Sequence, residues 1–396
     1  MGGSSAAEDA GAGMGSSSVG GVKDSGGSAS TVDSGGVDGS AGAGGADGGA
    51  VPTLLPTSIT GLTVVGASPA GSLRCDSDGT CYKNTTGRAN LTGTLNPGDG
   101  IFKMAPNGQT FALIGDNATP PAAPMAGLVT GLAVDGHGNV FACGLAYGGN
   151  AGTVPYQLAA GATQWTPIGT GLGNVRNVVC GEALVSDGST LFVGDSNLWE
   201  LPAGKTMWVD DGGPGSLGGS SVSATVPFKG DVYVATGASS DHAYVLKAGA
   251  AAFVALADPV QTLSRLAVDS AGNLLGHTPG ELGGGSPSPI FRLAPGDAKW
   301  TKTTGLAANT RPSNIVIDAD DNAYTVGYAS ASATTISLLK LAAGSLEWAK
   351  LFDVQGLDAT ETCDGKLGDG FVDSLADDHL GHLVLQCTST FLRSQP

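Results

Sequence analysis

Six polar residues have positions that would let them form a ligand-binding or catalytic cluster. Arginine and asparagine side chains donate the hydrogen bonds that a polar or anionic ligand needs. A glutamate in such a cluster acts as a general base once burial has increased its proton affinity. The six residues are Arg176, Asn177, Glu182, Arg265, Arg311 and Asn314. Whether they meet depends on the repeats that position them.

One repeat consists of a leucine-type residue, two or three intervening residues, a glycine and then an aromatic residue. It occurs six times, at 104–111, 158–165, 201–208, 246–253, 293–300 and 341–348. From the second copy on, successive glycines lie 43 to 48 residues apart. This is the period of a four-stranded propeller blade, so the sequence predicts an all-β propeller.

A second repeat lies between copies of the first and consists of two apolar runs around an Asp/Gly/Asn turn. Its clear copies are 132–141, 266–275 and 315–324, and its looser copies are 73–82, 184–192, 226–233 and 375–383. Two strands around such a turn form a β-hairpin. We therefore expect seven blades, each with an inner hairpin that carries the Asp turn and an outer hairpin whose Trp packs against a neighbouring blade.

The Asp of each inner turn sets a register that brings one position per blade close to the central channel. In six blades this position holds Ser72, Gly131, Glu182, Arg265, Asn314 and Ser374. Arg176, Asn177 and Arg311 lie just upstream, at the same rim. Two interpretations stay open: either these side chains bind a ligand, or Glu182 and Arg265 pair with each other across the channel. The second is the simpler.

Seven inner hairpins and six outer ones leave the last blade without its outermost strand. An apolar stretch at residues 51–58 precedes the first blade, and we expect it to supply that strand. Such an exchange closes the ring and removes an open edge. Pro52 and Pro56 suit an outermost strand, which needs fewer backbone donors than a central one.

The composition divides the chain into two parts. Residues 1–50 are almost entirely Gly, Ala, Ser and Asp, without an aromatic residue. Such a segment cannot bury enough surface to offset its chain entropy, so we predict a disordered tether. Residues 51–396 form the predicted propeller.

The charge balance argues against two classes of partner. The chain has 18 Lys and Arg against 35 Asp and Glu, and no basic stripe interrupts the excess of acids. Nucleic acids and anionic membranes both need a cationic surface, so neither is an expected partner. No apolar run reaches the length of a membrane span. No apolar stripe outside the repeat core stands out, and we expect a monomer.

The six cysteines fall where three disulfides would fit the blade model. Cys75 and Cys81 flank the first inner turn, so they should face each other across that hairpin. Cys143 and Cys180 have similar rim positions in adjacent blades, and Cys363 and Cys387 lie on one rim of the last blade. Three pairs with none left over indicate an oxidising compartment. Buried free thiols are the alternative.

Two acidic turns have spacings that could hold calcium. They contain Asp76 and Asp78 in the first blade and Asp318 and Asp320 in the sixth. Such turns also form without a metal, because Asp and Gly bond their own backbone and accept left-handed geometry. The acidic insert at 364–378 does not fit an EF-hand, because Gly365, Leu367 and Ala376 occupy ligand positions. Calcium is thus possible, and no other cofactor is expected.

The long Gly/Ser segment before a disulfide-rich propeller resembles a mature bacterial lipoprotein or surface protein. That resemblance implies a secreted, periplasmic or outer-surface location, with a lipid anchor attached upstream of the given chain. The tether would let the propeller stand away from the membrane.

The Asp-x-x-Gly-Asn hairpins of residues 59–396 resemble the units of the NHL-repeat and gluconolactonase-like propellers. The hydrolases of that group use acidic and amide side chains around a divalent metal in the channel, and a complete set is absent from the motifs here. Two functions remain. The favoured one is a non-enzymatic propeller that binds a protein, glycan or small ligand through the rim loops at 145–155, 276–289, 327–336 and 356–370. The alternative is a metal-dependent lactonase-like hydrolase or lyase at the channel mouth, with Glu182 and Asn314 sharing the metal.

Overall fold

The structure is a computed structural model that divides into two units, residues 1–48 and 49–396. It describes residues 59–395 except 60, 68–71, 85–100, 115–128, 145–154, 173–184, 187–189, 195–196, 213–220, 238–241, 260–262, 264, 278–287, 308–309, 311, 329–334, 356–365, 368–369, 372–374 and 388–389. The predicted tether at 1–50 and much of the four rim loops lie outside the described residues.

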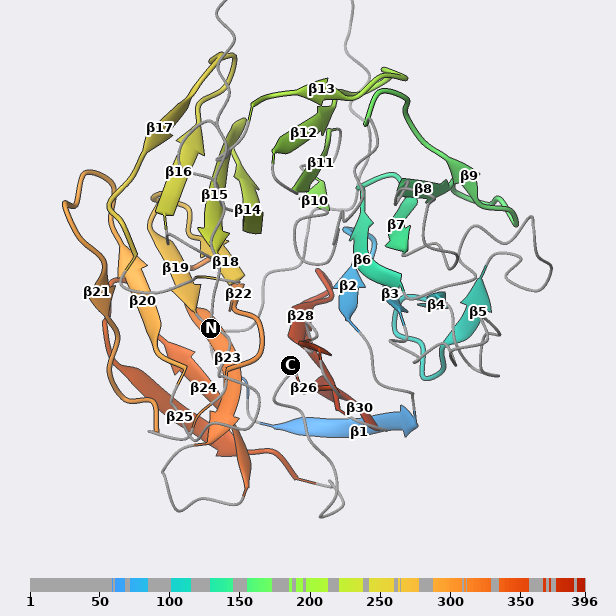
Figure 1. The fold of residues 1–396 in the computed structure, drawn as a ribbon. Helices are drawn as coiled ribbons and strands as arrows, with labels where there is room; N and C mark the ends of the chain where they lie inside the picture. Colours follow the sequence, from blue (N-terminus) through green and yellow to red (C-terminus); the bar gives the residue numbers. More distant parts are fainter. Residues whose placement is uncertain are drawn as a thin grey trace, which may run out of the picture. The chain divides into compact units, whose positions relative to one another are not determined.

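Residues 59–395 form seven four-stranded antiparallel sheets, which we number as blades (Figure 1). Blade 1 contains β2 (Leu73–Cys75), β3 (Cys81–Asn84), β4 (Ile101–Met104) and β5 (Ala112–Ile114). Blade 2 contains β6 (Val129–Val134), β7 (Val140–Gly144), β8 (Pro155–Leu158) and β9 (Thr166–Pro167). Blade 3 contains β10 (Val185–Ser186), β11 (Leu191–Gly194), β12 (Leu198–Leu201) and β13 (Val209–Asp210).

The remaining blades follow the same order from inside to outside. Blade 4 contains β14 (Ser221–Phe228), β15 (Asp231–Gly237), β16 (His242–Leu246) and β17 (Phe253–Ala255). Blade 5 contains β18 (Arg265–Val268), β19 (Leu274–His277), β20 (Ile290–Leu293) and β21 (Thr301–Lys302). Blade 6 contains β22 (Val316–Ile317), β23 (Ala323–Tyr328), β24 (Ile336–Leu341) and β25 (Trp348–Asp353). Blade 7 contains β28 (Leu375–Asp377), β29 (Leu383–Gln386), β30 (Thr390–Ser394) and β1 (Leu62–Ala67). A separate hairpin of β26 (Lys366–Leu367) and β27 (Gly370–Phe371) precedes blade 7.

The innermost strands of the blades form a closed ring. Each of β2, β6, β10, β14, β18, β22 and β28 contacts the next in this order, and β28 contacts β2. The predicted seven-bladed propeller is therefore confirmed. Where the inner turn is described, it joins the two inner strands of the blade, and the glycine turns join the two outer ones.

The strand that closes the ring is β1, which corrects our prediction. β1 pairs antiparallel with β30, from Leu62 opposite Ser394 to Ala67 opposite Thr390 (Figure 1). We expected residues 51–58, which lie outside the described part. The run Leu-Thr-Val-Val-Gly-Ala has β-branched residues and no proline, so every residue can donate to its neighbour. The broader prediction, that a strand N-terminal to the first blade completes the last blade, is confirmed.

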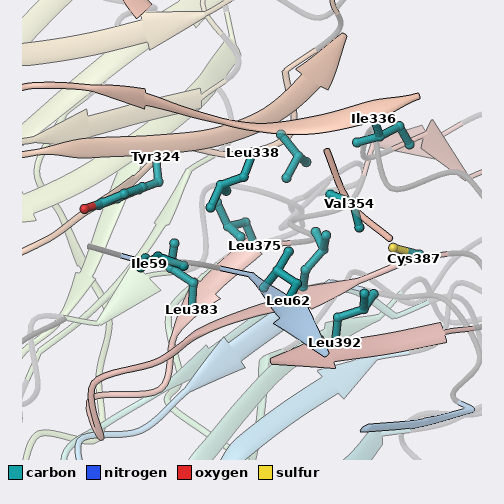
Figure 2. Close-up of a cluster of buried hydrophobic side chains, with 12 residues drawn as sticks. Ile59, Leu62, Tyr324, Ile336, Leu338, Val354, Leu375, Leu383, Cys387 and Leu392 are labelled. Carbon is teal, nitrogen blue, oxygen red and sulfur yellow. The ribbon is translucent and has the colours of Figure 1, made fainter. Parts of the chain in front are cut away.

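Apolar side chains fill the space between neighbouring blades. Between blades 6 and 7, Leu338 and Tyr324 pack near Leu375 and Leu383, with Leu62 of β1 at the outer side (Figure 2). Each outer-turn Trp packs against the preceding blade, as predicted. The Trp208 indole N–H, for example, donates to Ile168 O of blade 2 at 3.2 Å. In the described part of the chain, no helix is long and apolar enough to cross a membrane.

Candidate functional site

The Asp of the inner turn holds its own hairpin together. In blade 2, Asp135 Oδ1 accepts hydrogen bonds from the backbone N–H groups of His137 and Asn139, both at 2.9 Å. Its Oδ2 accepts from Asn139 Nδ2 at 2.8 Å. Asp269 in blade 5 and Asp318 in blade 6 make the same three kinds of bond. These carboxylates therefore have a structural role in the turn.

The Asn of the same motif joins the inner hairpin to the outer one. Asn139 Oδ1 accepts from Ala160 N at 3.0 Å in blade 2, and Asn322 Oδ1 accepts from Ala343 N at 3.3 Å in blade 6. The inner turn of blade 4 is shorter, and there Asp231 Oδ1 accepts from Ala248 N at 3.0 Å instead. The repeat is thus explained by hydrogen bonds that fix each blade.

The four candidate calcium ligands are divided among such turns. Asp76 Oδ1 accepts from Ser77 N, and Asp78 Oδ1 accepts from Thr80 N, each at 2.7 Å. Burial raises the pKa of Asp76, and the nearby carboxylates Asp78 and Asp135 raise it further. Asp320 is exposed beside the engaged Asp318. Within the described ranges no group of three or more His, Cys, Asp or Glu could hold a metal. Calcium at these turns stays a prediction.

The structure describes two members of the predicted ligand cluster. Asn314 bridges to blade 7, where its Nδ2 donates to Leu375 O at 2.5 Å and its Oδ1 accepts from Leu375 N at 3.0 Å. Arg265 is buried on β18, opposite His277 of β19. The other four members, Arg176, Asn177, Glu182 and Arg311, lie outside the described residues. The cluster and the Glu182–Arg265 pair therefore stay predictions.

One disulfide is fully described. Cys75 and Cys81 are cross-strand partners in the first inner hairpin and are bonded to each other. Cys143 and Cys387 each take part in a further disulfide. Their expected partners, Cys180 and Cys363, lie outside the described residues, so these two pairings stay predictions.

A groove of about 330 Å³ lies between blades 4 and 5. One wall is formed by β15, β16 and residues 254–257, and the other by Leu274 and the outer turn at 293–297. Tyr233, Val245 and Val254 are register partners on adjacent strands, so they form a row on one face of blade 4. Val254 is 53% exposed. The wall is therefore an accessible apolar surface.

Charged groups lie at the rim of this groove. Lys247 Nζ donates to Asp231 Oδ2 at 2.7 Å, and this hydrogen bond raises the pKa of Lys247. Burial alone would raise the pKa of Asp231, but the bonds from Lys247 and Ala248 N outweigh it and lower the pKa. Asp297 lies on the opposite side and is exposed, with Oδ2 3.3 Å from Ala294 N. Within the described part of the chain, no cation pairs with Asp297.

Two further ionisable groups have strongly shifted proton affinities. Burial lowers the pKa of Lys83 to about 7, although its ammonium lies 4.4 Å from the centre of the Phe111 ring. Burial also raises the pKa of Asp211 to about 7, with repulsion from Glu200 and Asp210 and a hydrogen bond with Glu200 adding to the effect. Both groups lie within blades and away from the groove.

Our sequence analysis missed the groove between blades 4 and 5. A signal was present in the outermost strand of blade 4, where residues 254–257 are Val-Ala-Leu-Ala. The outermost strands of blades 2 and 5 instead begin with Thr-Pro and Thr-Lys. Four consecutive apolar residues at a sheet edge indicate a partly uncovered surface.

Comparisons with known proteins identify the fold. No family model matches the chain, and no curated protein sequence matches it. The chain is similar to the WD40 repeats of RRP9, at 11% identity and a TM-score of 0.57, covering 86% of this chain and 99% of that one. It is also similar to YCF48 bound to a D1 peptide, at 10% identity and a TM-score of 0.53, covering 87% and 98%. A chain of the mitotic checkpoint complex matches at 11% identity and a TM-score of 0.55, covering 86% and 97%. At such identities the likeness shows a shared β-propeller fold.

Proposed function

We propose that this chain is a non-enzymatic β-propeller that binds a partner at its surface. The observation that carries the proposal is the groove between blades 4 and 5, which has an apolar wall and charged rim groups. Binding sites commonly combine an apolar surface with a few polar groups that orient the ligand. The acids of the inner turns, by contrast, are occupied by hydrogen bonds to their own hairpins.

Propellers of the same fold support this proposal by analogy. YCF48 was solved with a D1 peptide, and another similar chain belongs to the mitotic checkpoint complex. The alternative lactonase-like activity would need Asn314 to share a metal with Glu182. Its amide is instead engaged with the backbone of Leu375. Assignment to the NHL-repeat or gluconolactonase-like group remains part of the proposal, resting on the hairpin motif.

We also place the protein outside the cytosol, in a secreted or surface-attached state. The Cys75–Cys81 disulfide and the bonded Cys143 and Cys387 support this location, because cytosolic thiols are kept reduced. Thiol titration of the protein purified from its native source should find no free thiol. Six titratable thiols in the native protein would contradict the location.

Site-specific photo-crosslinking tests partner binding. A photoreactive amino acid replaces Val254 at the groove, or Val64 on β1 as a control with similar exposure (53% and 44%). Irradiation in an extract of the source cells should give a discrete adduct from position 254 that excess unlabelled protein removes. Metal-dependent turnover in a lactone and glycan screen, abolished by Asn314→Ala, would instead support the enzyme. Absence of an adduct at position 254 would contradict partner binding at the groove.

A further inference from the structure

Among the residues that the structure describes, two pairs of neighbouring blades are joined at their outer edge by a short backbone latch. After the outermost strand of blade 5, Thr304 N donates to Leu346 O at 2.8 Å, and Trp348 N donates to Thr304 O at 2.9 Å. Thr170 of blade 2 makes the same pair of bonds with Thr206 O and Trp208 N of blade 3, at 2.8 and 2.9 Å. Each latch is a parallel bridge that extends one blade onto the next.

The latch is missing between blades 4 and 5. Leu256 N donates to Ala243 O, as Thr303 N donates to Ile290 O in blade 5, so Ala257 is the counterpart of Thr304. In the described residues, no backbone bond joins Ala257 to the outer turn of blade 5. Ala257 is instead reached by the Trp300 indole N–H, which donates to Ala257 O at 2.8 Å. The outer turn of blade 5 therefore does not extend the sheet of blade 4.

The groove lies beside the place where this latch would be. Its walls include residues 254–257 of blade 4 and the outer turn of blade 5. Successive residues of a strand direct their N–H and C=O groups to opposite sides. Because Leu256 N points inward to β16, the backbone groups of Ala255 and the N–H of Ala257 point away from β16, while Ala257 O already accepts from the Trp300 indole. An edge of this kind is a template for an added strand.

The side chains along this edge indicate what kind of strand would fit. The row Tyr233, Val245 and Val254 offers an apolar wall. Lys247 is already neutralised by Asp231, whereas Asp297 has no cationic partner in the described part of the chain. The net charge of the chain is −17. Charge complementarity therefore favours a basic partner.

We propose that the groove between blades 4 and 5 binds an extended, basic peptide segment of a partner protein. Its backbone pairs with the N–H and C=O of Ala255 and with the N–H of Ala257, an apolar side chain packs against Val254, and a Lys or Arg pairs with Asp297. This inference rests on the proposed function and specifies the partner at the same site.

Selection of peptides against the whole protein tests the proposal. A phage library of random linear peptides is selected on the immobilised full chain, and one enriched peptide is synthesised with a fluorescent label. Its affinity is then measured by fluorescence anisotropy for the wild type and for Val254→Glu and Asp297→Lys. Val64→Glu on β1 and Glu347→Lys in the outer turn of blade 6 are the matched controls, since both residues are exposed. Circular dichroism confirms that each variant is folded.

We expect enriched peptides to carry an apolar residue near a Lys or Arg. Val254→Glu and Asp297→Lys should each weaken binding about tenfold or more, and the controls should change it less than about twofold. Enriched peptides that are acidic, or that bind both groove variants as well as the wild type, would overturn the proposed occupant. Such a result would leave partner binding intact if the photo-crosslinked adduct is still observed. A selection that enriches no peptide would also overturn the inference.

Discussion

Two ionisable groups with shifted pKa values, Lys83 and Asp211, contribute to the pH dependence of stability. Lys83 is fully buried on β3 and has a pKa lowered from 10.5 to about 7. The unfolded chain keeps the proton on this lysine between these values, whereas the folded chain releases it. Burial of the charged Lys83 therefore destabilises the folded state to its full extent below about pH 7, and this destabilisation disappears as the pH rises toward 10.5.

Replacing Lys83 by Met should stabilise the protein at neutral pH. The side chains have similar length, and each unit of lowered pKa corresponds to about 1.4 kcal/mol. We expect a gain of about 1 to 3 kcal/mol at pH 7 that shrinks toward pH 10, because the pKa of Lys83 is about 7. Urea unfolding at the two pH values measures it. Lys103→Met, an exposed change on β4, is the control, and equal gains for both variants would contradict the role of burial.

Asp211 should have the opposite pH dependence. Its pKa is raised from 3.8 to about 7, so the folded state binds more protons than the unfolded state between these values. Stability contributed by this group is present at low pH and is lost as the pH rises through about 7. We expect Asp211→Asn to raise the free energy of unfolding by about 1 to 2 kcal/mol at pH 8 and to change it little at pH 4.

The neighbouring acid provides the control for that change. Asp210 accepts two bonds from Asn197 Nδ2, at 2.9 and 3.0 Å, and is exposed. Asp210→Asn removes only the repulsion that Asp210 adds and loses the bonds from Asn197, so it should stabilise the protein less than Asp211→Asn at pH 8. If both variants gave the same increase at pH 8, general relief of negative charge would explain the effect better than the half-buried pair of Asp211 and Glu200.

Blades 2, 5 and 6 are each fixed by the Asp and Asn of their inner turn. Asp318 is 5% exposed and accepts bonds from Asn322 and from the Tyr324 hydroxyl. Asp318→Ala leaves these buried donors without an acceptor, and we expect a loss of about 2 to 3 kcal/mol in thermal or urea unfolding. Asp320→Ala, two residues away and exposed, should cost less than about 0.5 kcal/mol. A similar loss in both would contradict the turn-holding role.

The sequence predicts the hairpins well because their signals are local. The Asp-x-x-Gly-Asn turn brings its own acceptor, its own donors and a glycine with positive φ, such as Gly138 at 78°. The candidate site is less local. The groove between blades 4 and 5 lies beside a junction at which, among the described residues, Ala257 makes no backbone latch with the next blade, and the absence of a bond leaves no motif. Only the apolar run at 254–257 indicates it.

The closing strand shows how long-range pairing limits prediction for the whole molecule. Residues 51–58 and 62–67 are both apolar stretches ahead of the first blade, and the prolines of 51–58 do not exclude it, because an outermost strand tolerates proline. The choice depends on register over the length of the chain. β1 places Leu62 in the cluster between blades 6 and 7 (Figure 2). Gln395 N donates to Gly61 O, and Gln395 Nε2 donates to Thr63 Oγ1.

Two truncations therefore separate the candidate closing strands. A variant that lacks residues 1–58 keeps β1 and should unfold at the temperature of the full chain. A variant that lacks residues 1–67 loses β1, leaves β30 as an open edge and exposes Leu392, which is fully buried in the ring. Burial of one leucine contributes about 2 to 3 kcal/mol, and the lost backbone pairing adds to this. We expect this second variant to unfold at a clearly lower temperature and to aggregate through its open edge, as measured by differential scanning calorimetry and light scattering. Equal losses in both truncations would show that residues 51–58 contribute to closure, because β1 alone would then be insufficient to complete blade 7.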